Sequence, residues 1–95
     1  MTEALFSHID AQADDFVTRV MDYVRHPSIS AHDIGIREVA GILVDHLSGL
    51  GFDAELVETP GYPFVLGTFR VDPSKPTVLL YGHYDVQPPD PLEAW

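Results

Sequence analysis

The hydrophobic period of the chain changes once, at Gly51, and this change restricts the fold more than any other feature of the sequence. Before Gly51 the apolar residues recur at the three- and four-residue spacing of a helix surface. From Phe52 onward they alternate with polar residues or form short continuous runs, as they do in strands. The 95 residues therefore predict helices followed by strands in one small domain.

A first helix is predicted over residues 2–24. Thr2 is a candidate N-cap, and Pro27 stops the helix shortly after its last apolar residue. One face of the helix is expected to pack against the core. That face carries the apolar residues Leu5, Ile9, Phe16, Val17, Val20, Met21 and Val24.

A second helix is predicted over residues 33–50, with apolar residues repeating at helical spacing. Ser30 and Asp33 have the spacing of a capping box at its N-terminus. Gly51 stands where a left-handed C-terminal cap is expected, and Phe52 supplies the hydrophobic contact that follows such a cap.

Three strands are predicted after Gly51, over residues 52–56, 64–71 and 77–81. The Pro-containing turn at 72–76 predicts that the second and third strands pair in antiparallel orientation. The third run is continuous and apolar, which is typical of a strand covered on both faces. The order helix, helix, strand, strand, strand predicts an α/β fold with helices packed on a mixed sheet.

Charge and cysteine content exclude several classes of function. Fifteen Asp and Glu oppose five Lys and Arg, so the net charge of −10 leaves no basic face for nucleic acid or for an anionic membrane surface. The chain has no Cys, so any metal must be held by His and carboxylate. The sequence shows neither a signal peptide nor an apolar stretch near the roughly 20 residues of a membrane span, and a cytoplasmic location is expected.

The residues best suited to chemistry follow the third predicted strand. His83 and Asp85 are two positions apart, so an extended backbone points both side chains to the same side. A metal-bound imidazole needs an acceptor on its second nitrogen, and a carboxylate is a common one. Gly82 removes a side chain where the chain turns beside the pair. The spacing alone also suits a surface loop, and surface or capping roles are expected for His8, His26, His32 and His46.

A resemblance to a large metallopeptidase family lies in the string Leu79-Leu80-Tyr81-Gly82-His83-Tyr84-Asp85-Val86-Gln87-Pro88, which is similar to the family's first metal-site motif. The family comprises aminoacylases, acetylornithine deacetylases, succinyl-diaminopimelate desuccinylases and carnosine-type dipeptidases. The motif with Gln87 most resembles the dipeptidase branch. The segment Pro27-Ser28-Ile29-Ser30 resembles the loop after the family's first helix, and the order of helices and strands matches its opening topology, so the resemblance extends over essentially the whole chain.

The resemblance implies that residues 1–95 form the N-terminal portion of the catalytic domain of a dimetal exopeptidase. It implies that His83 is a ligand of one metal and that Asp85 serves catalysis by orienting the His83 ring. Zn²⁺ is the implied cofactor, with two divalent metals in a complete site and Mn²⁺ or Co²⁺ as alternatives. The implied substrate is a small peptide or an N-acyl amino acid, and a homodimer is the implied assembly.

Three functions are open on this evidence. The favoured one is metal-dependent hydrolysis of an amide or peptide bond, as a dipeptidase with metal-activated water as the nucleophile. The alternative within the family is an N-acyl amino acid deacylase. The third is a non-catalytic, truncated fragment or interaction module, because the family's bridging Asp, its Glu-Glu pair and its later ligands are not found in these residues. One His ligand cannot hold two divalent cations, so the 95 residues alone are expected to be inactive.

Overall fold

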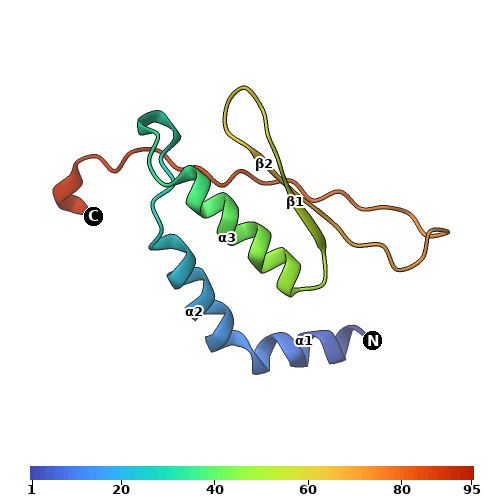
Figure 1. The fold of residues 1–95 in the computed structure, drawn as a ribbon. Helices are drawn as coiled ribbons and strands as arrows, with labels where there is room; N and C mark the ends of the chain where they lie inside the picture. The colour runs from blue at the N-terminus through green and yellow to red at the C-terminus, as the bar shows by residue number, and fades with distance from the viewer.

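The computed structural model describes all of residues 1–95 (Figure 1). It contains four helical segments before the sheet, two strands, and a short 3₁₀ turn near the C-terminus. In chain order these are α1 (Thr2–Ala11), α2 (Ala13–Val24), η1 (Ser30–His32), α3 (Ile36–Gly49), β1 (Asp53–Val57), β2 (Phe64–Thr68) and η2 (Leu92–Ala94).

The helix predicted over residues 2–24 is interrupted at Gln12, which separates α1 from α2. Gln12 leaves helical geometry, with φ −105° and ψ 8°. The polar stretch around it offers no large apolar side chain whose packing would favour a straight continuation. The N-cap is Met1 rather than Thr2, and no side chain caps the helix. Neither α1 nor α2 contains a buried residue, so the predicted packing of their apolar stripe is not formed within this chain.

Helix α3 packs on both strands and carries the small core, formed by Ile36, Val39 and Ala40. The cap predicted at its C-terminus is confirmed. Gly51 has φ +95° and donates to the Ser48 carbonyl at 3.0 Å, while the Phe52 N–H donates to the Leu47 carbonyl at 3.0 Å. These two bonds form a Schellman motif.

The predicted start of α3 is wrong by three residues. The helix begins at Ile36, and its N-cap is Gly35, in the left-handed region with φ +75°. Asp33 is also left-handed, with φ +53°, and ends η1 instead of opening α3. Ser30 and Asp33 therefore do not form a capping box, because neither residue caps the helix.

Strands β1 and β2 form a two-stranded antiparallel sheet whose register pairs Asp53 with Thr68 and Val57 with Phe64. The prediction that the second and third strands pair is wrong. The chain reverses between β1 and β2, where the Thr59 hydroxyl donates to the Tyr62 carbonyl at 2.7 Å and accepts from the Gly61 N–H at 3.1 Å. Such side-chain bonds stabilise a turn, and the first and second strands become neighbours.

The third predicted strand, residues 77–81, does not form. Its apolar side chains from Val78 to Tyr81 are 80% to 89% exposed. A continuous apolar strand is stable when it has partners at its sides and cover on both faces, and no other segment of the chain supplies them. The sheet is consequently antiparallel rather than mixed, while the layer of helix on sheet agrees with the predicted α/β class.

The molecule is extended. Its radius of gyration is 16.3 Å, against about 12 Å for a closely packed domain of this length. In Figure 1, the α1–α2 arm and the C-terminal segment both project from the unit of α3 and the sheet. None of the helices combines the length and the apolar composition that a membrane-spanning segment needs.

Candidate metal centre

The site lies where the loop between α2 and α3 contacts the residues that follow the apolar run at 77–81. Ile29 and Val86 form a parallel bridge, and the Val86 N–H donates to the Ser28 carbonyl at 2.7 Å. The Ser28 hydroxyl donates to the Tyr84 carbonyl at 2.6 Å, and Ser28 is only 4% exposed. Figure 1 shows this C-terminal segment running past η1. Ser28 thus holds residues 84–86 through both its hydroxyl and its backbone carbonyl.

The loop itself is closed by local hydrogen bonds. Ile29 and Ile34 exchange backbone bonds of 2.8 and 3.1 Å. The Tyr62 hydroxyl, from the β1–β2 turn, lies 2.9 Å from the Ser30 carbonyl and 3.1 Å from an Asp33 carboxylate oxygen. Burial, and then the hydrogen bond to Asp33, raise the pKa of the Tyr62 phenol. Contacts to residues 84–86 and to Tyr62 therefore hold the loop in place.

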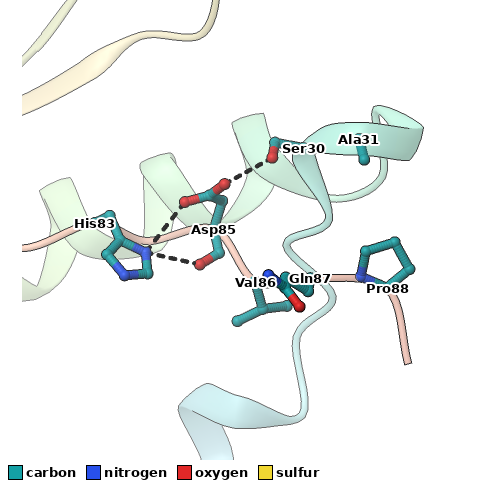
Figure 2. A pocket seen from close by; sticks show the side chains of 7 residues that line it. All are labelled: Ser30, Ala31, His83, Asp85, Val86, Gln87 and Pro88. Carbon is teal, nitrogen blue, oxygen red and sulfur yellow. Dashed lines mark hydrogen bonds and ion pairs between the residues drawn. The ribbon is translucent and has the colours of Figure 1, made fainter. Parts of the chain in front are cut away.

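His83 and Asp85 lie together, as their spacing predicts (Figure 2). Nδ1 of His83 is 2.9 Å from the Asp85 backbone carbonyl and 3.1 Å from Oδ1 of its carboxylate. Both of these oxygens can only accept, so the hydrogen belongs on Nδ1 of His83. In the neutral imidazole the other ring nitrogen, Nε2, then carries the lone pair, on a side chain that is 74% exposed. The ring is oriented as a metal-ligating histidine is when an outer carboxylate holds it.

The second oxygen of Asp85 is held as well. The Ser30 hydroxyl donates to Oδ2 of Asp85 at 2.6 Å, across 55 residues of sequence. This bond, more than any other contact, lowers the pKa of Asp85, and the neighbouring His83 lowers it further. Ser30, Asp85 and His83 form one hydrogen-bonded chain (Figure 2).

A cavity of about 360 Å³ opens beside this chain of residues. Its volume is within the range of small-molecule sites. The lining combines a few polar groups with small apolar ones, and consists of Ser30, Ala31, His83, Asp85, Val86, Gln87 and Pro88 (Figure 2).

Among the relatives that match the chain are three whose names give an activity. A Cys-Gly metallodipeptidase of Schizosaccharomyces pombe is 37% identical over 98% of the chain and 22% of its own length. A beta-Ala-His dipeptidase of Mus musculus is 30% identical over 100% of the chain and 23% of its own length. A succinyl-diaminopimelate desuccinylase of Methylobacterium nodulans is 36% identical over 76% of the chain and 18% of its own length.

The chain belongs to the metallopeptidase family of these dipeptidases and desuccinylases. It spans about a fifth of the length of the dipeptidases that it matches. No family model matches it. No solved structure matches it either.

The chain offers only part of a metal site. A catalytic zinc is typically held by three protein ligands and a water, and here no group of three or more His, Asp or Glu residues lies close enough to hold a metal ion. His8, His26, His32 and His46 join no such group. The donors present therefore fit one imidazole ligand with its orienting carboxylate, and they do not fit a complete metal centre.

Sequence reasoning missed the two serines of this candidate site. The segment from Pro27 to Ser30 resembles a loop of the family, but Ser28 has no predicted partner and Ser30 is predicted to cap a helix with Asp33. Their partners, Tyr84 and Asp85, lie more than fifty residues away in the sequence, and no pattern of neighbouring residues predicts such a hydrogen bond. The reason given for Gly82 is also wrong, because a Cβ atom there would meet nothing within 4 Å.

Proposed function

We propose that this chain is the N-terminal part of the catalytic domain of a metal-dependent dipeptidase, in which His83 binds a divalent metal through Nε2. The observation that carries the proposal is the contact of Nδ1 of His83 with the Asp85 carboxylate, which in the neutral imidazole leaves the lone pair on Nε2 of an exposed side chain that lines the cavity. Neutral imidazole with its other nitrogen held by a carboxylate is a common form of histidine at zinc sites.

The residues of this chain have distinct tasks in the proposed reaction. His83 supplies one metal ligand, and Asp85 holds its ring and keeps the hydrogen on Nδ1. When bound, a pair of divalent metals supplies an activated water and polarises the scissile carbonyl. The rest of the ligands and the general base lie outside the residues described above. Zn²⁺ is the proposed metal, and Mn²⁺ or Co²⁺ also suit imidazole and carboxylate donors.

Dipeptides are the proposed substrates because the relatives matched over nearly the whole chain are named for Cys-Gly and beta-Ala-His dipeptides. The desuccinylase match covers less of the chain. It supports deacylation of an N-acyl amino acid as the second candidate, since the same metal chemistry cleaves both kinds of amide bond.

The test uses the product of the longest open reading frame that contains this chain, purified and loaded with zinc, manganese or cobalt. The substrates are Cys-Gly, β-alanyl-histidine and N-succinyl-diaminopimelate. Hydrolysis of a dipeptide with at least tenfold higher kcat/KM than the succinyl compound supports the dipeptidase assignment. The reverse preference supports the deacylase, and no turnover of any amide by the metal-loaded protein contradicts both.

A His83→Ala variant makes the same experiment specific to the site. This variant is expected to lose both bound metal and activity, because it lacks the Nε2 atom that would bind the metal. His8→Ala is the matched control, since His8 is an exposed histidine in the last turn of α1 and joins no group that could hold a metal ion.

A further inference from the structure

We propose that Ser30 is a positioning residue of the metal site, which fixes the Asp85 carboxylate so that Asp85 in turn fixes the His83 ring. The inference rests on the proposed function, because it assigns to Ser30 a part in presenting His83 to a metal. The observation is the hydrogen-bonded chain from the Ser30 hydroxyl through both carboxylate oxygens of Asp85 to Nδ1 of His83.

The geometry of Asp85 explains why a second contact is needed. The side chain of Asp85 is 45% exposed, and that of His83 is 74% exposed, so neither is held by packing. A carboxylate with one partner rotates readily about its terminal torsion. Ser30 binds Oδ2 at 2.6 Å while His83 binds Oδ1 at 3.1 Å, so each oxygen has its own partner and the carboxylate plane is fixed.

Ser30 is itself anchored from outside the site. Its backbone carbonyl accepts from the Tyr62 hydroxyl at 2.9 Å. The neighbouring Ile29 forms a bridge with Ile34 and another with Val86. The hydroxyl of Ser30 is therefore presented from a braced loop, and its short bond to Asp85 transmits that rigidity to the two exposed side chains of the motif.

A purely structural role for Ser30 is the competing explanation, in which the bond only ties the loop to residues 84–86. The other contacts between these segments argue against it. The Ser28 hydroxyl bonds the Tyr84 carbonyl, and the Val86 N–H bonds the Ser28 carbonyl, at 2.6 and 2.7 Å. These bonds hold the backbones together without reaching the Asp85 side chain, whereas the Ser30 hydroxyl reaches only that side chain.

The experiment compares wild type, Ser30→Ala, Ser30→Thr and Tyr62→Phe in the product of the longest open reading frame. Ring-nitrogen NMR of ¹⁵N-histidine-labelled, metal-free protein reports the tautomer of His83, and competition with a chromophoric chelator reports zinc affinity. Tyr62→Phe is the matched control, because it removes a bond to the Ser30 backbone and leaves the Ser30 hydroxyl in place.

We expect the Nδ1–H tautomer of His83 in wild type and a smaller share of it in Ser30→Ala, where the Asp85 backbone carbonyl at 2.9 Å remains as an acceptor for Nδ1. Zinc affinity falls about tenfold in Ser30→Ala, the lower end of the range for outer partners of metal ligands. Ser30→Thr restores both properties because it restores a hydroxyl. Tyr62→Phe stays within about twofold of wild-type affinity, because the bridges of Ile29 with Ile34 and Val86 still hold the loop.

Two results overturn the positioning role: an unchanged tautomer ratio and zinc affinity in Ser30→Ala, or equal losses in Ser30→Ala and Tyr62→Phe. The second result would mean that general loosening of the loop causes the loss. Failure of the proposed function is seen separately, as a His83→Ala variant that binds zinc as tightly as the wild type.

Discussion

A Cβ atom on Gly35 would lie 1.9 Å from the carbonyl oxygen of Pro27. Gly35 also has φ +75°, where side chains other than hydrogen are strained. The close approach joins the end of α2 to the start of α3 and closes the loop that carries Ser28 and Ser30. The glycine is therefore required by the loop that supports the candidate metal centre.

Gly35→Ala is predicted to destabilise the protein by at least about 2 kcal/mol, since left-handed strain alone costs about 1–2 kcal/mol and the backbone must also move. Chemical denaturation of the variant measures the change. Gly41→Ala is the matched control. Its Cβ would meet nothing within 4 Å inside α3, and alanine there should stabilise by about 0.5–1 kcal/mol. Equal effects of the two substitutions would contradict the packing described for Gly35.

The small core makes a second prediction. Val39 is 1% exposed and sits on α3 against the sheet. Val39→Ala should lower the free energy of unfolding by about 1.5–3 kcal/mol, through lost burial and the cavity left behind. Val71→Ala, at an exposed valine after β2, should change it by less than about 0.5 kcal/mol. A Val39→Ala variant as stable as the wild type would show that α3 does not pack on β1 and β2 as described.

The bond between Ser30 and Asp85 makes a prediction about pH. It is the largest cause of the lowered pKa of Asp85. A carboxyl whose pKa is lower in the folded than in the unfolded protein stabilises the fold above its unfolded pKa, and this contribution is lost as pH falls through the folded pKa. Ser30→Ala should therefore raise the pKa of Asp85, and the stability difference between wild type and variant should narrow as pH falls below about 4. NMR titration of the Asp85 carboxyl carbon measures the shift, and an unchanged pKa would contradict the assigned cause.

The fourth prediction concerns the charge of the Asp85 carboxylate. Asp85→Asn keeps the shape of the side chain and removes its charge, so Nδ1 of His83 loses its charged acceptor and keeps only neutral ones, among them the Asp85 backbone carbonyl at 2.9 Å. Zinc affinity of the full-length protein should fall about 10- to 100-fold. Asp72→Asn is the control, because the pKa of Asp72 is also lowered by a serine, Ser74, in a turn that has no part in the site. A loss of affinity common to both variants would point to total charge rather than to the orienting carboxylate.

Features set by neighbouring residues could be predicted from the sequence. Helix α3 and its cap at Gly51 follow from apolar spacing and one glycine. The pairing of His83 with Asp85 follows from their two-residue separation. Both are local, so the pattern of residues is sufficient to place them.

Features that depend on distant partners could not be predicted. The run at 77–81 has the composition of a buried strand, and its state depends on partners that its own residues do not specify. The break at Gln12 reflects the absence of packing along α1 and α2. Ser30 looked like a helix cap because Asp33 lies at capping distance in sequence, whereas its partner is Asp85.

The most direct test of the central claim is the metal content of the product of the longest open reading frame that contains this chain and of its His83→Ala variant, measured by inductively coupled plasma mass spectrometry after zinc loading and dialysis. The account predicts that the wild type retains one or two zinc ions per chain and that His83→Ala loses at least one of them, while His8→Ala retains the wild-type content. Equal zinc content in wild type and His83→Ala would contradict the assignment of His83 as a metal ligand.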